Sequence, residues 1–200
     1  MASLPDVTAV GGRSRLLLWP AIAVVAMFVL GWAVGKGSTP LDDWFHEFRR
    51  TPARWLLFFT DPWVLAIALM FGIAVALYLG RRRLAAVMLI APLVGIVLAQ
   101  VLKRFFGRQS EGDLAYPSGH TTTVVIVMGM LVLLAGAVWW SVVVAAVAGL
   151  LAMIGQGVTY HYFTDTIGAA LLGSAVVCVA ALAAELDTRQ PGCDEDHTGG

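Results

Sequence analysis

Tyr116-Pro117-Ser118-Gly119-His120 stands between two long apolar runs of the chain. The polar stretch that contains this motif begins at Lys103, and a second polar group, His161 and Asp165, follows one apolar hairpin later. Ionisable residues are costly at membrane depth, so in an otherwise apolar chain they usually serve a function. We therefore expect these two polar groups to decide both the fold and the site.

The composition indicates an integral membrane protein. Of the 200 residues, 59% are hydrophobic and 13% are charged, and the mean hydropathy is +0.81. A soluble domain carries about 25% charged residues, so this chain has too little polar surface to remain in water. The formal net charge is zero, which gives no reason to expect a nucleic-acid partner. Cys178 lies in an apolar run and Cys193 in a polar tail, so no disulfide is expected.

The apolar segments predict an all-α, polytopic fold with about six transmembrane helices, because each crossing takes about 20 apolar residues. The domain is expected to cover residues 15–184, between a cytoplasmic N-terminal tail (1–14) and a polar, disordered C-terminal tail (185–200). The expected spans are 16–34, 62–79, 84–102, 118–138, 142–158 and 165–184.

Local signals support several of these boundaries. Thr60-Asp61-Pro62 combines a capping side chain with a proline at the first helical position, which is typical of a helix start. Gly168, Ala169 and Gly173 give the last span a stripe of small residues for close helix packing. Between the first two spans, residues 41–50 alternate aromatic and charged residues. This pattern suits a helix lying in the membrane interface, and an irregular loop with aromatic anchors fits equally well.

The order of the spans places both polar groups on one face of the membrane. The third span ends before Lys103 and the fourth begins at Ser118; the fourth and fifth spans then cross and return, which brings His161 back to the same side. Basic residues occur on both sides, so their count does not decide the orientation. The triplet Arg81-Arg82-Arg83 in a short loop favours cytoplasmic termini in the cell membrane and an extracytoplasmic site.

The segment 118–120 has the features of an anion site. It opens a helix, whose first backbone N–H groups lack helical partners and lie at the positive end of the dipole. Such a helix start binds phosphate readily. Ser118 adds a hydroxyl, Gly119 permits close approach to the backbone, and Lys103 adds a positive charge. An ordinary capped helix would show the same residues, so this motif alone does not identify a site.

His161 and Asp165 are spaced i, i+4, so on a helical turn they face each other. A carboxylate that holds one imidazole nitrogen fixes the tautomer and leaves the other nitrogen free to attack or to accept a proton. A metal site shared with His120, Glu111 or Asp113 is an alternative, but no third ligand stands at a diagnostic spacing. We therefore expect no metal and no other cofactor.

Taken together, the motifs resemble the type 2 phosphatidic acid phosphatase family of membrane lipid phosphatases, which is related to the vanadium haloperoxidases. That family has three blocks, Lys-x6-Arg-Pro, Pro-Ser-Gly-His and Ser-Arg-x5-His-x3-Asp, at two helix junctions on one membrane face. This chain has Lys103, then the motif 117–120, then His161 and Asp165, in that order. The likeness covers about residues 62–184.

The resemblance implies an enzyme that hydrolyses a phosphomonoester or diphosphate of a lipid, of the phosphatidate, phosphatidylglycerol phosphate or polyprenyl diphosphate type. It implies that His161 is the nucleophile and forms a phosphohistidine, that Asp165 orients this ring, and that His120 protonates the leaving oxygen. The phosphate oxygens would be held by Lys103, Ser118 and the backbone N–H of Gly119. Water would then release phosphate, and no metal takes part.

Both arginines of the family blocks are absent from their places. Counting seven residues from Lys103, the first-block arginine falls on Ser110. Counting back six residues from His161, the third-block arginine falls on Gly155. Loss of one preorganised donor typically lowers the rate by about 10²–10³, so a working site needs compensation.

Arg104 and Arg108 lie near Lys103 in sequence and are the candidates to bind substrate in place of these arginines, with Gln156 as a neutral donor. A second hypothesis is a degenerate, non-catalytic protein that binds a lipid phosphate or forms a complex, and a third is a lipid phosphotransferase. A transporter fits less well, because the charged groups stand at helix ends rather than near the bilayer midplane. The sequence indicates no oligomeric state.

Overall fold

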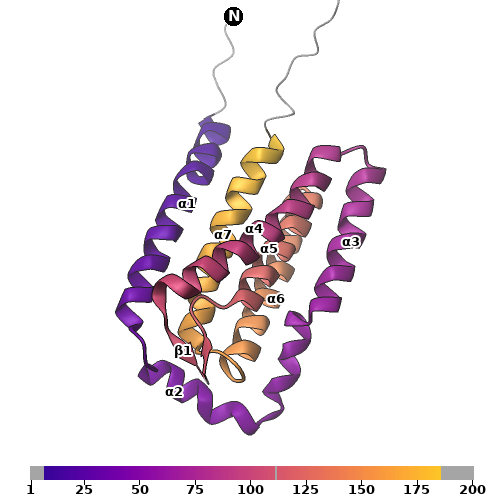
Figure 1. The fold of residues 1–200 in the computed structure, drawn as a ribbon. Helices are drawn as coiled ribbons and strands as arrows, with labels where there is room; N and C mark the ends of the chain where they lie inside the picture. The colour runs from indigo at the N-terminus through magenta and orange to yellow at the C-terminus, as the bar shows by residue number, and fades with distance from the viewer. Residues whose placement is uncertain (1–6, 111, 186–200) are drawn as a thin grey trace, which may run out of the picture.

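The computed structural model describes residues 7–110 and 112–185, and these form a helical bundle (Figure 1). Its helices are α1 (Val7–Val34), α2 (Pro40–His46), the 3-10 helices η1 (Glu47–Arg50) and η2 (Pro52–Thr60), α3 (Pro62–Tyr78), α4 (Arg82–Phe106), α5 (Gly119–Leu134), α6 (Trp139–Gly157) and α7 (Phe163–Glu185). A short antiparallel hairpin, β1 (Gln109–Ser110) and β2 (Asp113–Leu114), joins α4 to α5. The prediction of an all-α membrane fold is confirmed, with this hairpin as an addition.

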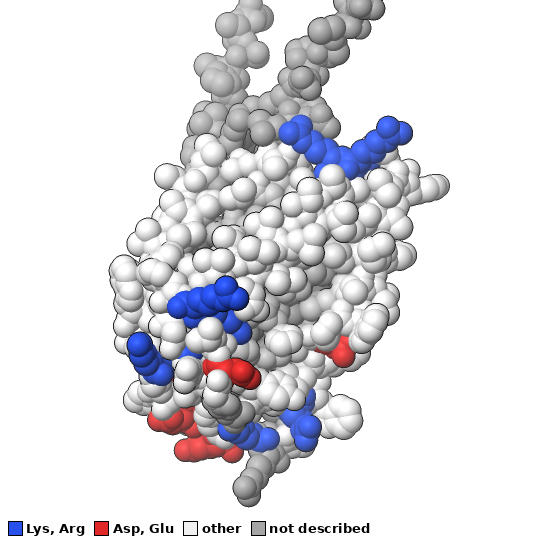
Figure 2. Space-filling view, in the orientation of Figure 1, with Lys and Arg blue, Asp and Glu red and all other residues white. Residues whose placement is uncertain are grey.

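Within residues 7–110 and 112–185, five helices are long and apolar enough to cross a membrane, and α5, at 16 residues, is a shorter apolar helix. The fourth predicted span therefore ends earlier than expected, at Leu134 rather than near residue 138. Gly136 adopts a left-handed φ of 78°, a conformation that terminates helices. At this helix end, Arg81 donates a hydrogen bond (2.8 Å) to the carbonyl oxygen of Leu134, which has no partner within the helix. On the face shown in Figure 2, charged side chains gather towards two ends of the molecule, and the band between them is uncharged.

The predicted helix starts of α3 and α5 are present. The Asp61 carboxylate accepts hydrogen bonds from the backbone N–H groups of Trp63 (2.9 Å) and Val64 (3.1 Å). Ser118 caps α5 through a hydrogen bond that its hydroxyl accepts from the Thr121 N–H (3.4 Å). Helix α1 begins at Val7, earlier than the predicted start at residue 16, so residues 7–14 of the expected N-terminal tail (1–14) are helical. Residues 1–6 of that tail, and 186–200 of the expected C-terminal tail (185–200), lie outside the described residues.

Residues 41–50, for which the sequence allowed a helix or a loop, form α2 and η1. Figure 1 shows α2 at the end of the bundle opposite the start of α1 and the end of α7, on the same side as the hairpin. Trp44 on α2 is exposed, whereas Asp42 is buried and the Phe45 ring stacks on Phe163 with 3.8 Å between ring centroids. Helix α2 is thus amphipathic, with its inner face fixed to the start of α7.

The small residues of α7 allow close packing, as predicted. A Cβ added to Gly168 would lie 2.5 Å or less from atoms of the Tyr116 ring, and one added to Gly173 would lie 2.8 Å from Val125. Helix α5 packs against α3, α4, α6 and α7, and it contributes the buried residues Ile126 and Met130 to the core. This packing brings the N-terminal end of α5 next to the N-terminal end of α7.

Candidate active site

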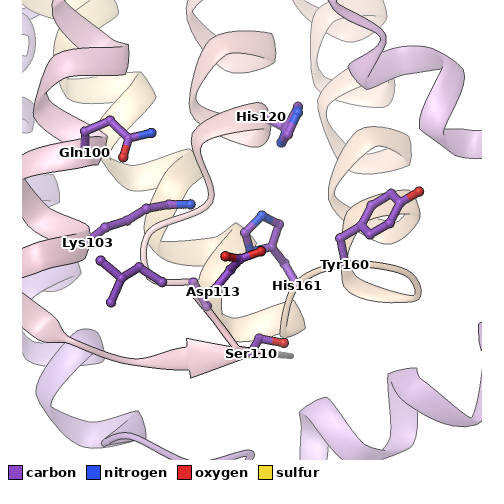
Figure 3. Close-up of a pocket in the computed structure, with 9 residues that line it drawn as sticks. Gln100, Lys103, Ser110, Asp113, His120, Tyr160 and His161 are labelled. Atoms are coloured by element: carbon purple, nitrogen blue, oxygen red, sulfur yellow. The ribbon is translucent and has the colours of Figure 1, made fainter.

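A polar cavity of about 440 Å³ lies where α4, the hairpin, the start of α5 and the α6–α7 turn meet. It is lined by Gln100, Lys103, Ser110, Asp113, Leu114, Ala115, His120, Tyr160 and His161. Three residues predicted from separate motifs, Lys103, His120 and His161, therefore share one cavity, as the order of the spans requires. Figure 3 shows Lys103 extending from α4 towards the space between the two imidazoles.

His120 and His161 face each other across this cavity. Their ring centroids are 6.5 Å apart, with an angle of 56° between the planes. His120 belongs to the first turn of α5, whereas His161 stands in the turn before α7. Both rings can therefore contact the same ligand in the cavity, which makes one of them a candidate nucleophile and the other a candidate proton donor.

His161 is held in the neutral form at physiological pH. Burial, together with the nearby positive charge of Lys103 and the His120 ring, lowers the pKa of His161 to about 3. A neutral imidazole carries the lone pair that nucleophilic attack requires. His161 therefore needs no prior deprotonation at neutral pH.

The contact between His161 and Asp165 is longer than the sequence predicted. His161 Nδ1 lies 3.9 Å from Asp165 Oδ2, which is an electrostatic contact and exceeds hydrogen-bond length. Within the described residues, Nδ1 has no hydrogen-bond partner. The Asp165 oxygens are occupied instead, since Oδ1 accepts from Arg108 Nη1 (2.7 Å) and Oδ2 accepts from the Tyr162 N–H (3.2 Å).

The two arginines expected to bind substrate do not line the cavity. Arg108 is buried with 1% exposure, and its guanidinium pairs with Asp42 (2.8 Å) and Asp165 (2.7 Å). Two buried carboxylates require a compensating charge, so Arg108 is directed away from the cavity. Arg104 is exposed and belongs to neither the polar cavity nor the apolar groove beside it. The prediction that these two residues hold phosphate is not supported by their positions.

Ser118 and Gly119 also differ in position from the prediction. Ser118 is fully buried as the cap of α5, and its N–H donates to the Asp165 carbonyl oxygen (3.2 Å). The Ser118 hydroxyl thus fixes the helix start, and it does not belong to the cavity wall. Gly119 lines the neighbouring groove, and no atom would lie within 4 Å of a Cβ added there, which leaves its backbone open to a ligand.

The positions of the missing arginines have different surroundings. Ser110 is on the cavity wall, so a small hydroxyl stands where the first-block arginine is expected. A Cβ on Gly155 would lie 2.8 Å from the backbone carbon of Leu56 in η2. Because this contact is with the backbone of the neighbouring 3-10 helix, there is no room for a side chain at residue 155 unless the helix shifts. Gln156, the neutral donor considered as a replacement, donates to the Thr60 hydroxyl (2.8 Å) and does not reach the cavity.

Sequence reasoning did not place three wall residues with polar groups, Gln100, Asp113 and Tyr160, in a phosphate site. Gln100 lies one helical turn before Lys103 in an otherwise apolar run, and this i, i+3 spacing could have identified it.

Asp113 was considered as a metal ligand, yet the described residues contain no group of three or more His, Cys, Asp and Glu side chains that could hold a metal ion. The cavity wall holds one cation, Lys103, and one acid, Asp113.

An apolar groove of about 440 Å³ adjoins the polar cavity. It runs between η2, α3, α4 and α5, and it shares Gln100, Lys103 and His120 with the cavity. Its other walls are mainly aliphatic: Pro62, Leu65, Ala66, Leu69, Pro92, Leu93, Ile96 and Val127. A single ligand can therefore place a polar group against the histidines and an apolar chain in the groove.

The fold defines a class: an all-α membrane protein with its polar cavity at one end of the bundle. No family model matches the chain, and no curated protein does either. Among solved structures, the chain is similar to the crystal structure of the first transmembrane PAP2 type phosphatidylglycerolphosphate phosphatase from Bacillus subtilis. The TM-score is 0.65 at 19% identity, over 87% of this chain and 98% of that chain. The chain thus has the fold of a transmembrane PAP2 type phosphatase.

Proposed function

We propose that the protein is a membrane lipid phosphatase that hydrolyses a phosphomonoester or diphosphate of a lipid. The observation that carries this proposal is the pair His120 and His161, which face each other across a cavity, with Lys103 extending from α4 towards the space between them. The adjoining aliphatic groove supports a lipid rather than a water-soluble phosphate ester. The substrate class includes phosphatidate, phosphatidylglycerol phosphate and polyprenyl diphosphates.

The reaction has two steps. The neutral His161 ring attacks phosphorus and forms an N–P bond, while the bond from phosphorus to the leaving oxygen breaks and the protonated His120 ring donates a proton to that oxygen. The positive charge that develops on the His161 ring is met by the Asp165 carboxylate, 3.9 Å from Nδ1. Water then attacks phosphorus and transfers a proton to His120 while the N–P bond breaks, which releases inorganic phosphate and restores His161.

Phosphate binding in this scheme depends on few donors. Lys103 provides the positive charge, and Gln100 and Ser110 provide neutral hydrogen-bond donors on the wall. Asp113 on the same wall opposes an anion. We therefore expect slower turnover than a site with two additional arginines would give, since each preorganised donor contributes about 10²–10³ in rate.

The test is phosphate release by the purified protein from the three lipid types in detergent micelles. We expect the wild type to release phosphate from at least one of them. His161→Ala and His120→Ala should each lower kcat by about 10³-fold or more, by analogy with removal of other catalytic groups. The control His197→Ala should leave kcat unchanged. Quenching in alkaline detergent during turnover, which preserves the acid-labile N–P bond, should trap phosphate on the wild-type protein and not on His161→Ala. If no lipid yields phosphate, or if His161→Ala keeps wild-type activity, the proposal is wrong.

A second candidate function, non-catalytic binding of a lipid phosphate, is favoured by Ser110 and Gly155 at the arginine positions. Binding without turnover should survive His161→Ala and fail with Lys103→Ala, which separates it from hydrolysis. A phosphotransferase would instead give a phosphorylated acceptor alcohol in the product analysis.

A further inference from the structure

A buried polar cluster surrounds the Arg108 guanidinium, outside the cavity wall. Nη1 donates to Thr164 Oγ1 and Asp165 Oδ1, both at 2.7 Å. Nη2 donates to Asp42 Oδ2 and to the Gly37 carbonyl oxygen, both at 2.8 Å, and Nε also donates to Gly37 (3.2 Å). Each nitrogen of this side chain is thus used, and Arg108 joins the segment before α2 to the first turn of α7.

Asp42 is the partner that comes from α2. Its carboxylate also accepts hydrogen bonds from the N–H and hydroxyl of Thr39 (3.0 and 2.8 Å) and from the N–H and hydroxyl of Thr164 (2.9 and 3.0 Å). Burial by itself would raise the pKa of Asp42, but the hydrogen bonds from Thr164 and Thr39 outweigh burial and lower it below its ordinary value. Asp42 therefore remains an anion with both oxygens occupied.

Aromatic contacts also fix residues 162 and 163, which lead from His161 into the first turn of α7. Phe45 stacks on Phe163 at 3.8 Å, and the His46 ring stacks on Tyr162 at 5.4 Å. The Arg108 guanidinium lies 4.4 Å over the Tyr162 ring. The three residues that follow His161 in the chain are thus each fixed by α2 or by Arg108.

We propose that Asp42 is a positioning residue for His161. This inference rests on the proposed function and goes beyond it, because Asp42 is absent from the cavity wall and acts through Arg108 and Thr164. It sets the place of the Asp165 carboxylate, whose 3.9 Å separation from His161 Nδ1 is close enough to stabilise a charged ring. Without the Asp42 charge, Arg108 retains one carboxylate partner, and the Arg108–Asp165 unit and the 162–164 turn lose their fixed anchor.

The test compares Asp42→Asn with Asp43→Asn, the same change at the exposed neighbouring position on α2. On the lipid that the wild type hydrolyses, we expect Asp42→Asn to lower kcat by about 10–100-fold, the usual effect of losing a group that orients a reactive one. KM should stay within about twofold because Asp42 has no contact with the cavity. Asp43→Asn should match the wild type, and Asp42→Glu should restore part of kcat.

A second measurement needs no turnover. Nitrogen-15 NMR of labelled histidine, with His161→Gln used for assignment, should show altered His161 ring signals in Asp42→Asn and unchanged signals in Asp43→Asn. Unchanged His161 signals, a kcat equal to that of Asp43→Asn, or an effect on KM alone would each overturn the positioning role. If the wild type hydrolyses no lipid, the proposed function fails, and the NMR comparison still decides the role of Asp42. If Asp42→Asn does not fold, Asp42→Glu is compared with Asp43→Glu in both measurements.

Discussion

At the scale of single residues, the cavity has an unusual electrostatic balance for a phosphate site. Lys103 and Asp113 are its charged wall residues, and His161 with a pKa of about 3 adds no positive charge at neutral pH. The two arginines that the sequence offers as replacements are engaged elsewhere or exposed. A substrate phosphate therefore meets the charge of Lys103, several neutral donors and, in the proposed reaction, the protonated ring of His120.

The effect of the missing first-block arginine can be tested by introducing an arginine at residue 110. Ser110 is on the cavity wall, so Ser110→Arg should add a charge-assisted contact and tighten the Kd for inorganic phosphate by about 10–100-fold, equivalent to about 1.5–3 kcal/mol. Calorimetric titration of the protein in detergent measures this change. The matched control is Gln109→Arg, which adds the same charge at an exposed position outside the wall. Equal affinities for the two variants would show that residue 110 does not reach bound phosphate.

At the scale of elements, the contact between α6 and η2 is tight at one point. The backbone of Leu56 lies so close to Gly155 that a Cβ would be 2.8 Å from its carbonyl carbon and 3.0 Å from its oxygen. Backbone atoms cannot rotate away as a flexible side chain can, so one of the two helices must shift to accommodate a methyl group.

We expect Gly155→Ala to lower the free energy of unfolding by about 1–3 kcal/mol, the usual effect of overpacking a filled interior. Gly149→Ala on the same helix is the control, because no atom lies within 4 Å of its added Cβ. There the gain in helix propensity should leave stability unchanged or higher by about 0.5–1 kcal/mol. Thermal unfolding in detergent distinguishes the two, and equal midpoints would contradict the packing argument.

The elements that were predictable from sequence are those set by local rules. Run length and capping residues gave the helices and the starts at Asp61 and Ser118, because a cap acts over three residues. The role of Arg108 was not predictable, since its partner Asp42 stands 66 residues earlier in the chain. The same holds for the contact of Gly155 with η2. The shared cavity of His120 and His161 was predictable because counting membrane crossings is a long-range rule that needs no side-chain detail.

At the scale of the whole molecule, the two ends of the bundle differ in what they carry. Figure 1 shows the start of α1 and the end of α7 at one end and α2 with the hairpin at the other. The cavity is at the hairpin end, because Ser110 and Asp113 belong to β1 and β2. We propose that the cavity end is extracytoplasmic and that the termini are cytoplasmic, with Arg81 in the turn between α3 and α4, and Arg82 and Arg83 at the start of α4, on the cytoplasmic side.

Labelling with a membrane-impermeant maleimide tests this orientation. In a chain with Cys178→Ala, the native Cys193 should react only after the cells are permeabilised. In a chain with Cys178→Ala, Cys193→Ser and Gln109→Cys, the exposed residue 109 should react in intact cells. Labelling of Cys193 but not of residue 109 in intact cells would reverse the proposed orientation.

The close approach of Leu56 to Gly155 has a consequence for how this site could change by mutation. An arginine can be introduced at residue 110 by one substitution, because that side chain enters open space. A single substitution cannot introduce an arginine at residue 155, because the 3-10 helix η2 must first move away to make room for the side chain. The two absent arginines therefore differ: a single substitution can restore the one at residue 110, whereas the one at residue 155 also requires the Leu56 backbone to move.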